Sequence, residues 1–223
     1  MNIIEINNLC ENFGKLEVLK NVSLKVNEKE NILITGPNGS GKTTLLRCIA
    51  LLEDINKGEI ILDGYKITPS TSKSAKENFM RQQVVGFVFQ ELHPWPHLTV
   101  LENLTKPLII VKRFSKEKAE KFASKILDLV GLHEKKNQYP SFLSGGQKRR
   151  LIIARTLVMD PKILLLDEIT ANLDVELKKE IYSVIRKISK NKTIIIVSHD
   201  IDLIKDFVDR VYYLKDGVLK LKS

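Results

Sequence analysis

Apolar residues follow two different spacings along this chain, and the spacings predict which segments are strands and which are helices. Residues 3–9, 18–26 and 60–62 show alternating or β-branched character, which is typical of strands. Three further runs are largely apolar at successive positions, at residues 31–35, 163–166 and 193–197. Such runs are typical of strands in a parallel sheet that helices cover on both faces.

A helical spacing dominates the middle of the chain and returns in its second half. Apolar residues recur at three- and four-residue intervals over residues 119–130, and Gly131 follows as a helix stop. The same spacing runs over residues 177–188. The sequence therefore predicts one α/β domain over residues 1–223, with a helical subdomain at about residues 91–155.

The composition is that of an ordinary globular protein, with 43% hydrophobic and 28% charged residues. The net charge of +9 comes from basic residues spread along the chain, so we interpret it as a solvated surface and expect no nucleic acid partner. No apolar run approaches the roughly 18 residues of a membrane span, and no signal peptide is visible. Membrane work would therefore need partner chains. Cys10 and Cys48 lack metal-ligand spacing and are expected to be reduced thiols.

Residues 36–43 predict a phosphate-binding loop. Their sequence fits the pattern G-x-x-x-x-G-K-[ST], between an apolar strand and an expected helix. Glycines let backbone N–H groups approach phosphates closely, and the helix N-terminus adds a favourable dipole. Lys42 would neutralise the β- and γ-phosphates of a nucleotide, and the Thr43 hydroxyl would ligate Mg²⁺. The residues expected to contact the nucleotide here are Gly36, Pro37, Asn38, Gly39, Ser40, Gly41, Lys42, Thr43 and Thr44.

Two carboxylates, Asp167 and Glu168, end the apolar run that starts at residue 163. Because ligands of open parallel sheets bind at the carboxyl ends of strands, we expect both near the phosphate-binding loop. Asp167 would hold Mg²⁺, mostly through water. Glu168 would act as a general base or would position the attacking water. A solvated acidic strand end is the alternative, and the presence of the loop argues against it.

Residues 143–147, Leu-Ser-Gly-Gly-Gln, narrow the class of phosphate-binding protein. This pentapeptide resembles the signature motif of ATP-binding-cassette (ABC) proteins, and it opens an expected helix whose N-terminus would bind an anion. The resemblance covers essentially the whole chain. It implies a P-loop NTPase fold with a RecA-like core, an N-terminal antiparallel β part and a helical subdomain.

The same resemblance implies an ATPase that works with ATP and Mg²⁺ at two composite sites. Two cassettes, copies of this chain or a similar one, would meet head to tail. Each ATP would lie between the phosphate-binding loop of one cassette, which includes Lys42, and the signature motif of the other cassette. The signature residues implied to bind it are Ser144, Gly145, Gly146 and Gln147.

The remaining landmarks of the family occur in the expected order along the chain. By resemblance, Gln90 would touch Mg²⁺ and the transport subunit, and His199 would contact the γ-phosphate. Phe13 stands where an aromatic residue stacks on adenine, with an apolar strand end as the alternative. Asp174 ends a stretch that resembles the loop crossing the dimer interface. The expected catalytic set is Lys42, Gln90, Glu168 and His199, and the expected metal set is Thr43, Gln90 and Asp167.

The chain departs from the family pattern at a few positions. Ile169 stands where Pro is usual, so we expect a less stiff loop there. Asn172 replaces a smaller residue. Lys148 and Arg149 follow the signature where uncharged glutamines are common, and two cations in a first helical turn oppose the helix dipole. They are expected either to form a solvent face or to adjust ATP affinity in trans.

The resemblance also implies partners: transmembrane permease subunits, with this chain peripheral on the cytoplasmic face of the inner (plasma) membrane. Residues 91–100 form a stiff, apolar stretch where the family has a groove for a short permease helix. Trp95 and Leu98 are therefore expected to be partly exposed and to contact the permease, with ordinary core packing as the alternative.

The transported substrate follows only from similarity of short segments. Residues 96–103, 139–140 and 159–162 look similar to importers of polar amino acids, which would add an extracytoplasmic solute-binding protein. Residues 170–174 and the short length look more like cassettes of lipoprotein release, macrolide export or cell division. We favour the importer.

Three other classes of protein lack support in the sequence. A DNA-repair ATPase would need a long coiled-coil insertion, and no sustained heptads occur. A translation factor of this superfamily would carry two cassettes, and a GTPase would need an Asn-Lys-x-Asp base reader.

Overall fold

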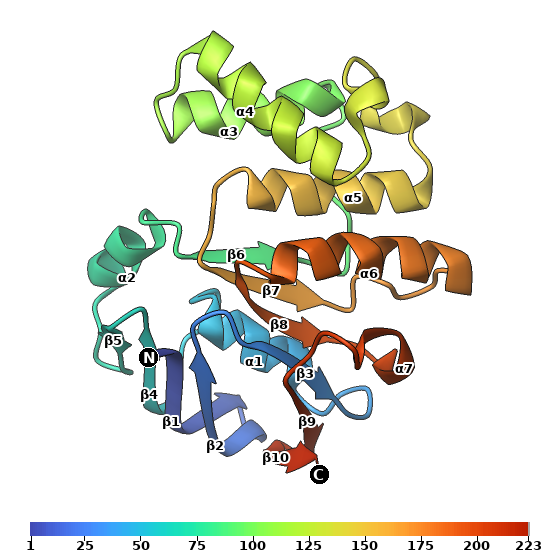
Figure 1. Cartoon of the computed structure of the whole chain (residues 1–223). Helices are drawn as coiled ribbons and strands as arrows, with labels where there is room; N and C mark the ends of the chain where they lie inside the picture. The colour runs from blue at the N-terminus through green and yellow to red at the C-terminus, as the bar shows by residue number, and fades with distance from the viewer. Residues whose placement is uncertain (223) are drawn as a thin grey trace.

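The computed structural model describes residues 1–222, which form two β-sheets and a set of helices (Figure 1). The strands are β1 (Asn2–Phe13), β2 (Leu16–Asn27), β3 (Asn31–Thr35), β4 (Lys57–Leu62), β5 (Tyr65–Ile67), β6 (Val85–Val88), β7 (Ile163–Asp167), β8 (Thr193–Val197), β9 (Arg210–Lys215) and β10 (Val218–Lys222). The α-helices are α1 (Lys42–Ile49), α2 (Lys73–Met80), α3 (Val100–Ile110), α4 (Lys116–Leu129), α5 (Gly145–Leu157), α6 (Val175–Ser189) and α7 (Ile201–Ile204). Two 3-10 turns are η1 (His133–Lys135) and η2 (Pro140–Phe142).

The larger sheet has six strands in the order β10-β9-β3-β8-β7-β6. All neighbours from β9 to β6 pair in parallel, and β10 pairs with β9 in antiparallel fashion. The strands expected at residues 31–35, 163–166 and 193–197 are β3, β7 and β8, so the predicted parallel core is confirmed. The spacing of apolar residues did not predict β9 or the edge strands β6 and β10.

The central strands β3, β7 and β8 are apolar at their middle positions because each of their faces packs against a different layer. In β3, Leu33 belongs to the core under α3, α4, α5 and α6, whereas Ile32 and Ile34 belong to the core around α1. All three side chains are fully buried. Full burial of such a side chain stabilises the fold by about 1.5–3 kcal/mol, so both faces of the sheet contribute to stability.

The smaller sheet is antiparallel, with strand order β2-β1-β4-β5, and confirms the expected N-terminal β part. Figure 1 shows α1 between this sheet and the larger one. The Cys10 and Cys48 thiols are both free and buried, as expected of reduced cysteines.

Helices α3, α4 and α5 lie together beyond β6 and β7, in the green to orange part at the top of Figure 1. Their starts are fixed by capping side chains: Thr99 and Glu102 form a capping box at α3, and Ser115 caps α4. Gly131 has φ +67° two residues after the end of α4, the backbone conformation of a helix stop. Within residues 1–222, none of the helices combines the length and the apolar character needed to span a bilayer.

Candidate functional site

The loop over residues 36–41 connects β3 to α1 and depends on glycine at two close approaches. At Gly36, where φ is +150°, an added Cβ would lie 2.0 Å from the carbonyl oxygen of Leu214. Gly41 has φ +100° at the start of α1, and a Cβ there would lie 3.0 Å from the carbonyl oxygen of Val18. A side chain would be strained at either position. Glycine has none, and this lets the backbone turn back over the N-terminus of α1.

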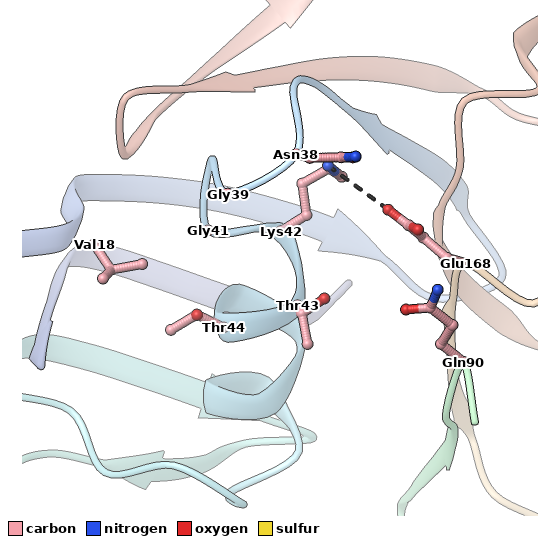
Figure 2. A pocket seen from close by; sticks show the side chains of 9 residues that line it. All are labelled: Val18, Asn38, Gly39, Gly41, Lys42, Thr43, Thr44, Gln90 and Glu168. Carbon is pink, nitrogen blue, oxygen red and sulfur yellow. Dashed lines mark ion pairs between the residues drawn. The ribbon is translucent and has the colours of Figure 1, made fainter. Parts of the chain in front are cut away.

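A cavity of about 360 Å³ opens beside this loop (Figure 2). Its lining residues are Val18, Asn38, Gly39, Gly41, Lys42, Thr43, Thr44, Gln90 and Glu168. The structure therefore brings together most of the expected loop with Gln90 and Glu168, which come from the ends of β6 and β7. In Figure 2 the Lys42 and Glu168 side chains point toward one another across the cavity.

The donor groups of the loop suit a phosphate. Lys42 is only 4% exposed, and its Nζ donates to the carbonyl oxygens of Gly36 (3.0 Å) and Pro37 (2.9 Å). Ser40 Oγ is buried and has no hydrogen-bond partner among the described residues. Buried polar atoms normally have partners, so this hydroxyl fits a ligand oxygen at the loop. An anionic phosphate would also give Lys42 a stronger acceptor than two neutral carbonyls.

Oxygen atoms that could ligate a metal gather around Thr43, one of the residues that line the cavity. Thr43 Oγ1 donates to Asp167 Oδ1 over 3.2 Å, and Asp167 is 3% exposed. Burial raises the pKa of the Asp167 carboxyl, the hydrogen bond from Thr43 partly offsets this, and the negative charge of Glu168 raises it again. A divalent cation would offset both the burial and the repulsion. With Gln90 nearby, this set has the carboxylate, hydroxyl and amide oxygens that Mg²⁺ accepts. Nowhere in residues 1–222 do three His, Cys, Asp or Glu side chains cluster for metal binding.

The side chains of Lys42 and His199 converge on Glu168. Its Oε1 lies 3.8 Å from Lys42 Nζ and 3.7 Å from His199 Nε2. The Glu168 backbone has φ +45°, a left-handed conformation that costs a non-glycine residue on the order of 1–3 kcal/mol. Strain of this kind persists only where the surrounding structure imposes it, and it aims the carboxylate at the cavity.

The signature residues lie outside the Lys42 cavity of their own chain. Ser144 caps α5: its Oγ accepts from Gln147 N (3.3 Å), and Gln147 Oε1 accepts from Ser144 N (3.0 Å). Gly145 is exposed, whereas Gly146 is buried against Leu177, to which an added Cβ would come within 3.1 Å. None of the signature residues is among those that line the Lys42 cavity of the described chain.

Other expected site residues also do not line the Lys42 cavity: Phe13, Gly36, Pro37, Ser40, Asp167, Asp174 and His199. Phe13, at the end of β1, is 49% exposed. Asp174 caps α6, and its Oδ1 accepts from Leu177 N over 2.9 Å. Pro37 is exposed at the loop, next to Asn38.

The expectation of a solvent face at Lys148 and Arg149 is wrong for Arg149. Lys148 is half-buried, but Arg149 is buried, and its Nη1 donates to the carbonyl oxygen of Ala171 over 3.0 Å. The reason is that α5 packs along α6 and the loop before it, and the spacing of charges along the sequence does not report that contact.

Two residues of the site were missed in the sequence. Val18 lines the cavity because β2 passes against Gly41, a contact between distant segments that no local pattern signals. Arg47 lines a second cavity of about 350 Å³ together with Thr43, Gln90 and Asp167. Its position four residues after Thr43 places both on one face of α1, and that helical spacing was a usable signal.

This arrangement defines a nucleoside triphosphatase with a P-loop, and comparison with known proteins gives its family. The family model described as "ABC transporter" matches residues 19–171, more than half of the chain. The chain belongs to the ABC transporter family, and the expected ATPase class is confirmed.

Curated relatives match nearly the whole chain. The arginine transport ATP-binding protein ArtM of Bacillus subtilis (strain 168) is 42% identical over 97% of this chain and 89% of its own length. The glutamine transport ATP-binding protein GlnQ of Escherichia coli (strain K12) is 41% identical over 96% of this chain and 88% of its own.

Solved structures of the same fold agree. The ATP-binding cassette MJ0796, in a dimeric post-hydrolysis state bound to ADP and Pi, superposes with a TM-score of 0.86 at 35% identity, over 99% of this chain and 98% of that one. The protein cbiO1 from Clostridium perfringens, part of the transporter complex cbiONQ, gives a TM-score of 0.89 at 29% identity, over 99% and 87%. The expected ABC cassette fold with its P-loop NTPase core is thereby confirmed.

Proposed function

We propose that this chain powers an importer of polar amino acids by hydrolysing ATP in the cavity beside Lys42. The observation that carries the proposal is the convergence at Glu168, whose Oε1 faces both Lys42 Nζ and His199 Nε2 within 3.8 Å. Lys42 and His199 would bind the γ-phosphate. A carboxylate beside both of them is in position to hold the water that attacks this phosphate.

Each residue then has a role that its position permits. Lys42 and the N–H groups at the start of α1 bind the β- and γ-phosphates. Glu168 holds the attacking water and accepts its proton, and His199 donates a hydrogen bond to the γ-phosphate. Phe13, at the exposed end of β1, stacks on the adenine.

Mg²⁺ fits the oxygen donors of Thr43, Asp167 and Gln90, and when bound it would neutralise phosphate charge that builds up during the transfer. The residues themselves prepare this side of the site before any metal enters. Thr43 already orients Asp167 through their hydrogen bond, and burial of Asp167 disfavours an uncompensated negative charge there.

A second cassette is needed to complete the site. The signature begins α5 with a capped but exposed N-terminus, and it contributes nothing to the cavity of its own chain. A head-to-tail dimer would place Ser144 and the following N–H groups against the phosphates bound by the partner. Binding of ATP would then close the dimer, and hydrolysis would open it.

The remaining partners are proposed from the relatives and from one surface. The relatives are transport ATP-binding proteins for arginine and glutamine, so we infer transmembrane permease subunits, an extracytoplasmic solute-binding protein and a polar amino acid as cargo. Trp95 is 38% exposed and Leu98 is half-buried, which leaves both able to contact a permease helix. The chain would work as a peripheral subunit on the cytoplasmic face of the membrane.

A Lys42→Ala variant tests the ATPase part of this proposal. Loss of the ammonium should lower Mg²⁺-dependent ATP turnover by about 100-fold or more, because one preorganised donor at a developing charge contributes that much. Lys121→Ala, an exposed lysine on α4, is the matched control and should keep wild-type turnover. Equal turnover in both variants would refute the placement of ATP at this loop.

The transport part needs a separate experiment. A tagged copy of the chain would be recovered from its native membranes, and the proteins that accompany it would be identified by mass spectrometry. A small permease together with an amino-acid-binding protein is the expected result. A permease with a large extracytoplasmic domain and no binding protein would refute the importer.

A further inference from the structure

A buried tyrosine on α6 joins the loops that carry Glu168 and His199. Tyr182 Oη lies 2.7 Å from Thr170 Oγ1 and 2.8 Å from Ser198 Oγ. Thr170, Ser198 and Tyr182 are 2%, 3% and 3% exposed. Because Thr170 stands two residues after Glu168 and Ser198 directly precedes His199, one side chain bridges the ends of the adjacent strands β7 and β8.

The carboxylate of Asp200 ends this chain of hydroxyl groups. Asp200 Oδ2 accepts from Thr170 Oγ1 over 2.7 Å and lies 3.1 Å from Tyr182 Oη. One placement of protons satisfies the shortest contacts: Ser198 donates to Tyr182, Tyr182 to Thr170, and Thr170 to Asp200. A fully satisfied buried network of this kind rigidifies the segments that it joins.

Lys178 keeps the acceptor at the end of the network charged. It lies one helical turn before Tyr182 on α6, and its Nζ donates to Asp200 Oδ1 over 2.6 Å. Partial burial by itself raises the pKa of the Asp200 carboxyl, but the hydrogen bonds from Lys178 and Thr170 and the charge of Lys178 outweigh it, and the net pKa is lowered. Both anchors of the network therefore come from a single helix.

The network forms one wall of a small cavity onto which Glu168 and His199 open. The cavity is about 60 Å³, and its lining residues are Glu168, Thr170, Ala171, Lys178, Ser198, His199 and Asp200. Glu168 holds a strained backbone at φ +45° just before Thr170, so the fixed Thr170 hydroxyl supports a conformation that the chain would otherwise relax.

We propose that Tyr182 is a positioning residue for ATP hydrolysis: its hydroxyl fixes the distance and orientation between Glu168 and His199. The proposal rests on the proposed function, which assigns the water to Glu168 and the γ-phosphate to His199. Since Asp174 caps α6 and ends the loop assigned to the dimer interface, the same helix links that interface to the catalytic pair.

Tyr182→Phe tests the role of the hydroxyl and keeps the ring that packs near Phe207. We expect kcat for ATP to fall about tenfold, because Thr170 and Ser198 each lose a buried partner. KM for ATP and the affinity for a non-hydrolysable ATP analogue should stay within about twofold, because no group that touches nucleotide is removed. An unchanged kcat, or a loss that appears in KM instead, would overturn the proposal.

Two further variants keep the test decisive. Tyr212→Phe removes another buried hydroxyl, the acceptor of a 2.7 Å hydrogen bond from Arg210, and should leave kcat unchanged. If Tyr182→Phe does not fold, Lys178→Met replaces it. That variant breaks the ion pair to Asp200 from a half-buried position and should lower kcat several-fold at constant KM. Wild-type kcat in Lys178→Met would overturn the proposal.

A Glu168→Gln variant measured in parallel distinguishes a failure of the positioning role of Tyr182 from a failure of the proposed ATP hydrolysis at Glu168. If Glu168→Gln is inactive and Tyr182→Phe has wild-type kcat, only the positioning role fails. If both variants have wild-type kcat, the assignment of the water to Glu168 fails as well.

Discussion

Arg149 donates a hydrogen bond from Nη1 to the carbonyl oxygen of Ala171, 3.0 Å away. Arg149 lies near the start of α5, directly after the signature, and Ala171 begins the loop that leads to Asp174. Arg149 is 9% exposed, and burial lowers the pKa of its guanidinium. This hydrogen bond therefore connects two segments of one protomer. One is the start of α5, whose signature is proposed to contact the ATP bound by the partner, and the other is the loop at residues 171–174, which is proposed to lie at the dimer interface.

Arg149→Met tests that tie, because it removes the donor and keeps much of the side-chain length. A hydrogen bond from a charged donor contributes about 1.5–3 kcal/mol, but the variant also removes a buried cation, so the free energy of unfolding should change little. The loop at 171–174 should loosen instead. In the wild type, the backbone N–H groups of Ala171 and Leu173 donate to the carbonyl oxygens of Glu168 and Thr170. Amide hydrogen exchange at Ala171 and Leu173 should become faster in the variant.

Lys148→Met is the matched control for the Arg149 variant. Lys148 is the neighbouring cation on α5 and is only half-buried. Exchange in the loop should be the same as in the wild type. Equal exchange rates in both variants would mean that Arg149 does not hold the loop.

Gly36→Ala should disable the phosphate-binding loop by steric conflict. The new Cβ would stand 2.0 Å from the carbonyl oxygen of Leu214, so β3 and β9 would have to separate. We expect a loss of about 3 kcal/mol in the free energy of unfolding, with ATP affinity reduced in parallel. Denaturant titration and nucleotide titration measure the two effects.

Gly14→Ala controls for backbone strain alone. Gly14 also has a positive φ of +61°, but an added Cβ there meets open space. Its cost should be about 1–2 kcal/mol, with normal ATP affinity. A Gly36 variant no more affected than this control would show that the close approach to Leu214 is easily relieved.

Local patterns were sufficient to predict the parts of the site that depend on a few adjacent residues. The signature was expected to open a helix, and Ser144 caps it. Asp174 stands shortly before the helical spacing at residues 177–188 and caps that helix, because capping needs only a side chain three residues before an N–H group. The strand, loop and helix around Lys42 were predictable for the same reason.

Contacts between distant segments were not predictable in this way. Val18 lines the cavity only because β2 is packed against Gly41, and the burial of Arg149 follows from how α5 lies on the loop before α6. Tyr182 reads in the sequence as one more core residue of an amphipathic helix. Its hydroxyl acquires partners only when β7 and β8 are paired.

Trp95→Ala should separate ATP hydrolysis from attachment to the permease. The indole stands 4.9 Å from the Arg155 guanidinium, and Asn103 holds the Trp95 backbone at both N–H and C=O, so the exposed ring is fixed in place. ATP turnover should stay within about twofold. Recovery of the chain with membranes should fall about tenfold, the effect of losing one aromatic anchor.

Ile110→Ala is the control for the Trp95 variant, because Ile110 is 59% exposed at the end of α3. Its membrane recovery should be unaltered. Wild-type recovery of the Trp95 variant would exclude this surface from the permease contact.

The most direct test of the account is the rate of ATP hydrolysis by Glu168→Gln, measured as kcat at saturating ATP and Mg²⁺. The amide keeps the size of the side chain but cannot accept the proton of water, so kcat should fall about 100- to 10,000-fold. ATP should still bind, and the variant should accumulate as an ATP-dependent dimer. Glu176→Gln, whose side chain is 82% exposed on α6, should match the wild type. Wild-type turnover in Glu168→Gln would contradict the account, because the residue on which Lys42 and His199 converge would then have no part in hydrolysis.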